Sequence, residues 1–212
     1  MKDINKDPLT GLYTAVSFDM AIDSAMVGDE SGRSTSIALF DIDRFLEVNR
    51  AFGHDEGDAV LKELASLFLN SFAETDIATY RIGGDEFAVL MPGIEKEKAF
   101  LNMESARSDF ADLDALGYIE PHPTLSAGVA TYPDDGSTRQ EVIRKANDAL
   151  FRAKSAGRNR VALAREEKKI PKTSHYTHGQ LERLGTLSKK EGVGEAELLR
   201  EALDDLLKKY NS

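Results

Sequence analysis

The chain has 212 residues, of which 41% are hydrophobic, and its formal net charge at pH 7 is -10. This length suits one domain of ordinary size and a smaller unit, while the charge argues against a basic nucleic-acid surface over the whole chain. The absence of cysteine excludes disulfides and thiolate metal sites. Neither a signal pattern nor a membrane-spanning apolar run is found, which predicts a cytoplasmic protein without a membrane partner.

The N-terminal part predicts a helix followed by a buried strand. Apolar positions over residues 18–26 indicate a helix that ends near Gly28, and a polar loop follows it. Residues 36–43 form a nearly continuous apolar run that ends in acids, the pattern of a strand buried on both faces. Asp41 and Asp43 are two positions apart, so a continuing strand carries both carboxylates on one face.

Helices are predicted on both sides of the central motif. Residues 44–57 read as a short helix and turn, and residues 59–72 are amphipathic with the period of a helix. Asp58 falls at the N-terminal end of the second helix, where capping is the ordinary role of an aspartate. A long helix over 95–116 and a strand over 124–131 are expected further along.

A last helix and strand are predicted before residue 165. The segment 137–140 reads as a capping box that opens a helix running to Ala156, with Gly157 as its stop. Residues 160–163 would form an edge strand. The order of elements predicts an α/β (α+β) fold, in which flanking helices cover a mixed sheet.

The central motif is the stretch 81–87, which lies between two apolar runs. Gly83 and Gly84 read as the turn of a β-hairpin whose tip carries Asp85 and Glu86. A bulky polyanion could lie directly against the bare glycine backbone. Since carboxylates do not bind phosphate unaided, the motif implies a divalent cation.

The first strand and the hairpin can lie side by side in such a sheet. This would bring Asp41 and Asp43 next to Asp85 and Glu86, and four unpaired acids in one place would repel strongly. A pair of Mg²⁺ ions would remove the repulsion. Two metal ions beside an open turn suit in-line displacement at a phosphate, with one ion activating the attacking hydroxyl and the other neutralising the leaving pyrophosphate.

Other side chains are candidates for binding the rest of a nucleotide. Lys154 and Arg158 are four apart at the end of the last helix, so they either hold phosphate oxygens or simply complement the helix C-terminus. Asn49 and Asp58 could read a guanine base, since a carboxylate accepts from its N1–H and N2–H₂ groups. Their alternative roles are a turn residue and an N-cap.

Seven segments of the chain resemble, in order and spacing, the GGDEF domain of diguanylate cyclases, over roughly residues 5–164. They are 7–12, 41–45, Asn49, 53–58, 81–87, 126–129 and 153–159. The resemblance implies a fold similar to the palm of nucleotide cyclases and polymerases. It also implies that two GTP molecules condense into cyclic di-GMP and two pyrophosphates, in a site completed only when two domains of a homodimer face each other.

The resemblance assigns roles to individual residues. The catalytic residues would be Asp85 and Glu86, with Asp85 either a metal ligand or a group that helps deprotonate the 3′-hydroxyl. The ligands of two Mg²⁺ ions per site, which Mn²⁺ can replace, would be Asp41, the Ile42 carbonyl, Asp85 and Glu86. The substrate-binding residues would be Phe45, Asn49, Asp58, Gly83, Gly84, Lys154 and Arg158.

Two further expectations follow from the same comparison with the family. Arg81 is expected to pair with Asp7 and tie the N-terminal segment to the hairpin. The intact Asp58 argues against the relatives that accept ATP through a smaller residue at this position.

The chain also departs from the family pattern. Leu46 stands where members usually carry lysine, which removes one phosphate contact, and Thr14-Ala15 and Arg50 replace other common residues. Residues 74–77 lack the Arg-x-x-Asp motif of the primary inhibitory site. We therefore expect no product feedback through that site.

The tail has a pattern of its own after a charged linker at residues 165–171. A short strand-compatible segment, 172–176, precedes a capping box at 177–180 and a helix, and a second amphipathic helix covers 198–210. About 40 residues cannot bury these leucines alone. The tail resembles a ribbon-helix-helix module, a strand-helix-helix whose strand pairs with that of a second chain.

Three readings of the tail remain open: a dimerisation module, which is favoured, a DNA-binding module, and a simple helical hairpin. Its acids and bases nearly cancel, so attraction to DNA phosphates would be weak. The predicted domains are therefore 1–164 for the cyclase and 172–212 for the module. The chain is predicted to be a diguanylate cyclase, with a non-catalytic GTP-binding regulator that acts on DNA or protein through its tail as the alternative.

Overall fold

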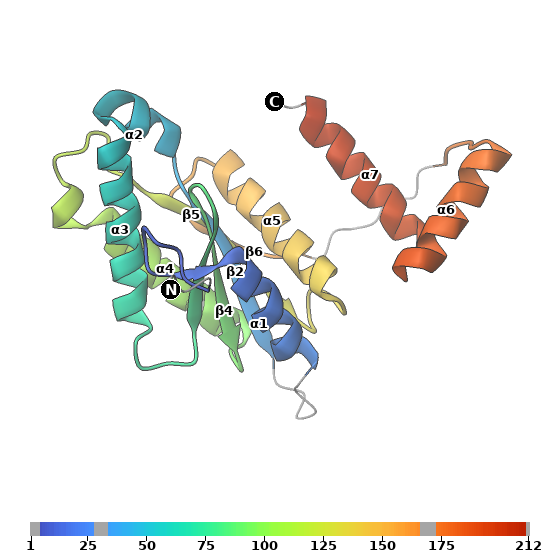
Figure 1. Ribbon diagram of the computed structural model, residues 1–212, viewed down its shortest axis with the longest axis horizontal. Coiled ribbons are helices and arrows are strands. Elements are labelled where there is room, and N and C mark those ends of the chain that lie inside the picture. The colour runs from blue at the N-terminus through green and yellow to red at the C-terminus, as the bar shows by residue number, and fades with distance from the viewer. Residues whose placement is uncertain (1–4, 28–33, 166–172, 211–212) are drawn as a thin grey trace. The chain divides into compact units, whose positions relative to one another are not determined.

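The computed structural model describes residues 5–27, 34–165 and 173–210 (Figure 1). The chain divides into two compact units, Met1–Glu166 and Glu167–Ser212. The loop expected after the first helix and the linker expected at 165–171 lie outside the described residues, except for Ser34 and Arg165.

The first unit is built on a six-stranded mixed sheet with the strand order β1-β3-β4-β2-β5-β6. Its strands are β1 Tyr13–Thr14, β2 Thr35–Ile42, β3 Ala78–Gly83, β4 Glu86–Pro92, β5 Leu125–Tyr132 and β6 Val161–Leu163. Central β2 runs antiparallel to both β4 and β5, whereas the edge strands β1 and β6 are parallel to their neighbours. The predicted edge strand is β6. Strand β1 was not predicted, because two residues carry no periodicity.

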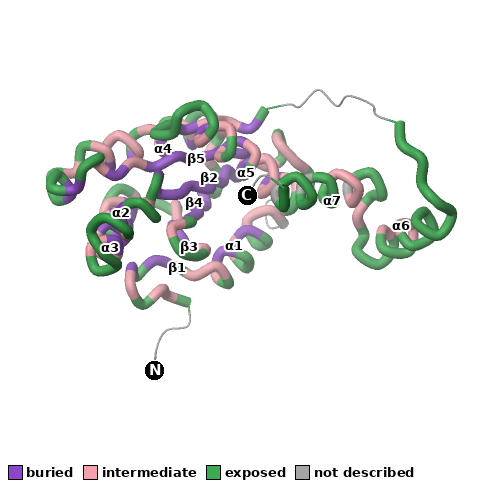
Figure 2. The backbone as a smooth tube through the Cα atoms, turned by 90° about the horizontal axis from the view of Figure 1, so that it is seen from above, coloured by how far each residue is buried: buried purple, intermediate pink, exposed green. Residues whose placement is uncertain are grey.

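Helices cover both faces of this sheet. They are α1 Ala15–Val27, α2 Phe45–Phe52, α3 His54–Ser71, α4 Lys96–Ala111 and α5 Arg139–Ser155, with a 3₁₀ turn at Asp114–Leu116. One apolar core joins the sheet to α3 and α4, and a second joins its other face to α1 and α5. Figure 2 shows the buried strands between these layers.

Strand β2 lies between β4 and β5 in the middle of the sheet, and every one of its residues is buried, as its apolar run predicted. Phe40 of β2 stacks on Phe68 of α3 at 4.6 Å and on Phe87 of β4 at 5.2 Å between ring centroids. A strand buried on both faces has a strongly specified register, since a slip of one residue would exchange its two faces. The position of the residues at its end is therefore well defined.

Three helix boundaries differ from the prediction. Helix α3 begins at His54, so Asp58 lies inside the helix and does not cap it; the N-cap is Gly53, without a side-chain cap bond. Helix α4 ends at Ala111, before the 3₁₀ turn. Thr138 is the N-cap of α5 and accepts from the Glu141 amide, one residue later than the predicted box. Capping positions depend on backbone geometry as well as residue type, which explains these shifts.

The second unit consists of α6 His178–Glu191 and α7 Glu195–Tyr210. Thr177 and Gln180 form the predicted capping box of α6, and Gly192 ends that helix in the left-handed conformation. Residues 173–177 form no strand, in contrast to the expected strand at 172–176. A ribbon strand needs a second strand to complete its hydrogen bonds, and a single chain does not provide one.

No helix in the described part of the chain combines the length and the apolar character that crossing a membrane requires.

Candidate active site

The end of the central strand carries the first acid of the site. Asp41 lies opposite Glu86 in the antiparallel register of β2 and β4, and the Ile42 amide donates to the Asp85 carbonyl at 3.4 Å. This confirms the prediction that the first strand and the hairpin lie side by side. The acids near the ends of these two strands therefore meet at one edge of the sheet.

Asp41 is paired with a cation from another layer of the fold. Lys154 of α5 places Nζ 2.7 Å from Oδ2 of Asp41, whose residue is only 8% exposed. Burial raises the pKa of Asp41 to about 6, with a further rise from the charges of Asp85 and Asp43, while the bond and charge of Lys154 act in the opposite direction. Burial thus disfavours the ionised form of Asp41, and a nearby cation stabilises that form.

Asp43 has a different environment from Asp41. Its carboxylate accepts from the hydroxyls of Thr124 and Ser126 at 2.8 and 2.7 Å and from the backbone amide of Asn159 at 2.9 Å. Asp43 therefore joins the end of β2 to the start of β5 and to the loop after α5. Its hydrogen bonds give it a positioning role in this loop.

Arg158 lies in that loop and not on α5, whose C-cap is Ala156. The prediction that Lys154 and Arg158 share the last turn of one helix was therefore wrong. Gly157, Arg158 and Asn159 have positive φ angles of 113°, 64° and 47°. Left-handed conformations are uncommon outside glycine and cluster at functional sites. The hydrogen bond that the Asn159 backbone amide donates to the Asp43 carboxylate stabilises this loop conformation.

A cavity of about 360 Å³ lies between α2 and two loops. Arg44 of the β2–α2 turn, Glu47 of α2 and His122 of the loop before β5 contribute to its lining, together with Arg158. Asn49 and Asp58, the predicted base-reading residues, are not among the lining residues. Of the predicted substrate-binding residues, Arg158 alone lines this cavity.

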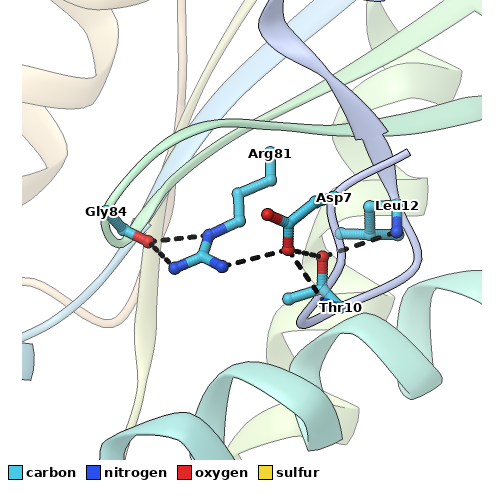
Figure 3. A network of polar contacts seen from close by, with 5 residues as sticks. All are labelled: Asp7, Thr10, Leu12, Arg81 and Gly84. Atoms are coloured by element: carbon cyan, nitrogen blue, oxygen red, sulfur yellow. Dashed lines mark hydrogen bonds and ion pairs between the residues drawn. The ribbon is translucent and has the colours of Figure 1, made fainter. Parts of the chain in front are cut away.

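The hairpin turn consists of Gly84 and Asp85, since β3 extends to Gly83. A Cβ atom on Gly83 or Gly84 would meet nothing within 4 Å, so the turn is open, as a ligand lying against it would require. Arg81 holds the turn, because its Nε and Nη2 atoms donate to the Gly84 carbonyl at 3.0 and 2.8 Å (Figure 3). Its Nη1 donates to Asp7 at 3.0 Å, which confirms the predicted pair.

Asn49 of α2 lies against the first turns of α3. A Cβ atom built on Gly57 would overlap Oδ1 of Asn49 and would lie 3.2 Å from Cζ of Phe45. The Asn49 side chain is thus placed next to the residue that precedes Asp58.

One feature of the site was missed in the sequence. Helix α2 begins after Arg44, which has a φ of 57° and makes no side-chain cap bond to the helix. The first amides of a helix have no partner within it, and with the helix dipole they attract anions. The signal that could have revealed this is the lack of Ser, Thr, Asp or Asn immediately before residue 45.

The donor set at this edge suits a hard divalent ion. Asp41, Asp85 and Glu86 offer carboxylates, and Ile42, the residue after Asp41, offers a backbone carbonyl. The buried carboxylate of Asp41 already forms an ion pair with Lys154. Within the described ranges, no three His, Cys, Asp or Glu side chains are arranged to hold a metal by themselves. Mg²⁺ commonly takes one or two carboxylates and completes its shell with water and substrate phosphates.

Comparison with known families supports the interpretation of this geometry. Residues 4–160 match the model described as diguanylate cyclase, GGDEF domain, and residues 168–211 match the model described as ribbon-helix-helix domain. Similar sequences include the uncharacterized protein YhcK of Bacillus subtilis, 34% identical over 76% of this chain and 46% of that protein. The response regulator PleD of Caulobacter vibrioides is 33% identical over 73% of this chain and 35% of that protein. The diguanylate cyclase DgcM of Escherichia coli is 39% identical over 61% of this chain and 30% of that protein.

The matched part of the chain spans less than half the length of each of these relatives. Among solved structures, the GGDEF domain of DgcB from Caulobacter crescentus in complex with c-di-GMP has a TM-score of 0.70 at 30% identity, covering 77% of this chain and 98% of that one. The active GGEEF domain of a diguanylate cyclase from Vibrio cholerae has a TM-score of 0.58 at 30% identity, covering 72% and 91%. The chain therefore belongs to the GGDEF family of diguanylate cyclase domains, and it carries a ribbon-helix-helix domain after the GGDEF domain.

Proposed function

We propose that this protein is a diguanylate cyclase that condenses two GTP molecules into cyclic di-GMP and two pyrophosphates across a homodimer. The observation that carries the proposal is that Asp41 and Glu86 lie opposite each other in the register of β2 and β4, beside an open glycine turn. The names of relatives such as DgcM point to the same activity. Residues 1–164 would form the cyclase domain, 165–171 a linker and 172–212 a dimerisation module.

In this proposal the acids hold two Mg²⁺ ions, for which Mn²⁺ can substitute. Asp41, the Ile42 carbonyl, Asp85 and Glu86 would be the ligands, and Asp85 would alternatively accept the proton of the attacking 3′-hydroxyl. Bound metal supplies activation of that hydroxyl and neutralisation of the leaving pyrophosphate. The protein's own contribution is to hold the acids close together at the end of a rigid sheet.

The triphosphate is proposed to bind between the start of α2 and the loop after α5. The uncapped amides of α2, the Arg158 guanidinium and the Lys154 ammonium supply positive charge there. Gly83 and Gly84 leave the turn bare for the ligand. Leu46, which is 59% exposed, contributes no charge in place of the usual lysine.

The base is proposed to be guanine, bound by Asn49 and Asp58 with Phe45 close by. The Asp58 carboxylate would accept from N1–H and N2–H₂ of guanine, and the Asn49 carboxamide would meet O6 or N3. Adenine lacks this pair of donors, so Asp58 would reject it through an unpaired charge.

The second unit is proposed to bring two cyclase domains together. None of the residues of α6 is buried, and neither is any residue of α7 whose burial is described. Exposed apolar side chains run along both helices; they are Leu181, Leu187, Leu203, Leu206, Leu207 and Tyr210. A second copy of the module would cover them, and linking two domains raises their effective concentration for the shared site.

The test is incubation of the purified full chain with GTP and Mg²⁺, with cyclic di-GMP followed by chromatography. We expect product from the native protein and loss of at least about a hundredfold in rate for Glu86→Gln, because one charged ligand of a catalytic metal is removed. Glu97→Gln, an exposed change at the start of α4, is the matched control and should leave the rate unchanged.

Product at equal rates in the Glu86 and Glu97 variants would contradict the proposed site. If GTP binds but no product forms at any protein concentration, the protein is a non-catalytic nucleotide-binding regulator.

A further inference from the structure

Gly57 lies so close to α2 that a side chain at this position would displace a neighbouring side chain. It lies in the first turns of α3, is buried and has no positive φ angle, so its backbone does not require glycine. A Cβ atom at this position would overlap Oδ1 of Asn49, would lie 3.0 Å from Cγ of the same side chain and 3.2 Å from Cζ of Phe45. The constraint on residue 57 therefore comes from two side chains of α2.

The atoms that a Cβ at residue 57 would overlap belong to side chains, which indicates that glycine at this position serves function more than folding. Alanine is favoured over glycine inside a helix, so glycine here costs stability. At Gly128, in contrast, a Cβ would overlap backbone atoms of α5, which cannot turn away. At Gly57 the overlapped atom is the end of a side chain, which can rotate out of the way. The fold would tolerate alanine at 57, but the carboxamide of Asn49 would leave its position.

We propose that Gly57 is a positioning residue for base recognition, which lets Asn49 lie beside Asp58 so that one purine edge meets both side chains. This inference rests on the proposed function and deepens it, because it assigns part of the nucleotide specificity to a residue that touches no ligand. Asn49 comes from α2 and Asp58 from α3, so the distance between their polar groups depends on how closely the two helices approach. The missing side chain at 57 leaves room for the Asn49 carboxamide against the first turns of α3.

The chemistry predicts a selective defect when the contact is disturbed. With alanine at 57, the Asn49 carboxamide turns away and its hydrogen bond to the base is lost, while Asp58 still accepts from the guanine donors. Loss of one such bond weakens binding roughly tenfold. Inosine triphosphate lacks only the 2-amino group that Asp58 reads, so the ratio of GTP to inosine triphosphate affinity should stay the same.

The experiment is calorimetric titration of the full chain with GTP and with inosine triphosphate in the presence of Mg²⁺, using Glu86→Gln as the common background to prevent turnover. The variants are Gly57→Ala, Asn49→Ala and the double variant. We expect Gly57→Ala and Asn49→Ala each to weaken GTP binding roughly tenfold, and the double variant to be no weaker than Asn49→Ala. The Tm of Gly57→Ala should equal or exceed that of its parent.

Gly179→Ala in α6 is the matched control, since a Cβ there meets nothing within 4 Å, and it should leave nucleotide affinity unchanged. The inference is overturned if Gly57→Ala binds GTP as tightly as its parent, or if its loss adds fully to that of Asn49→Ala. It is also overturned if weaker binding comes with a lower Tm. Failure of the parent protein to bind any guanine nucleotide would instead remove the proposed function, and this inference with it.

Discussion

At the scale of single residues, Asp7 links the N-terminal segment to the hairpin of β3 and β4. It accepts from the amide and hydroxyl of Thr10 at 2.9 and 2.7 Å and from Arg81, which also holds the turn at Gly84. Burial by itself would raise the pKa of Asp7, but the bonds from Thr10 and Arg81 outweigh it and leave the pKa below its ordinary value. The ionised carboxylate is therefore the form that stabilises this region.

This lowered pKa predicts a pH-dependent effect of Asp7→Asn. The contribution of the carboxylate is fully present above its ordinary pKa of about 3.9 and is lost as the pH falls through the lower, folded-state pKa. At neutral pH we expect the variant to lose about 1–2 kcal/mol in free energy of unfolding. Urea unfolding at pH 7 and at stepwise lower pH measures the difference, which should shrink toward zero in acid. A constant difference at every pH would mean that the charge is not the source of the stability.

At the scale of elements, the packing of α5 against β5 places Lys154 next to Asp41. Val142, Ala146, Ala149 and Ala153 turn their small side chains toward the sheet and are buried. Gly128 of β5 completes this close approach, because a Cβ atom there would overlap the Ala146 carbonyl and the Leu150 amide. The distance between helix and sheet is therefore set by small residues on both surfaces.

Gly128→Ala is expected to destabilise the first unit by about 3 kcal/mol, since overpacking against backbone forces the helix outward. Thermal unfolding followed by circular dichroism measures this, and a shift of at least several degrees downward is expected. The matched comparison is Gly57→Ala, the same chemical change at a position where only side-chain atoms must move. Equal Tm values for the two variants would contradict the distinction between backbone and side-chain obstruction.

At the scale of the whole molecule, each unit has a separate task in the proposed mechanism. Along α6 and α7 the residues whose burial is described are exposed or intermediate, as the green and pink of these helices in Figure 2 show. A unit of this size buries too little surface to be stable alone. A dimer of the module would supply the missing contacts and keep two half-sites near each other.

Leu203→Glu places a charge among these apolar side chains and should make the protein monomeric at concentrations where the native chain is a dimer. Sedimentation velocity measures the state of assembly. Cyclase activity of the variant should fall at low protein concentration and rise more steeply than linearly as concentration increases, because two monomers must meet. Lys189→Glu, at an exposed position of α6, controls for the added negative charge. A variant that stays dimeric and fully active would exclude α7 from the interface.

The features that depend on local patterns could be predicted from the amino-acid sequence. Its apolar run predicted a strand buried on both faces, its paired glycines predicted a hairpin, and the acids at the ends of both were correctly expected at one edge of the sheet. The Thr177 capping box is local in the same sense. Alternation, turn chemistry and caps are read over a few residues, so no knowledge of distant contacts was needed.

The relative positions of the charged groups in the site depend on tertiary packing and could not be predicted from local patterns. The ion pair between Lys154 and Asp41 and the three hydrogen bonds to Asp43 join segments that are far apart in the chain. The obstruction between Gly57 and Asn49 likewise exists only once α2 has folded back against α3. Such contacts depend on how elements pack, and residue type or spacing alone does not encode the distance between two packed surfaces.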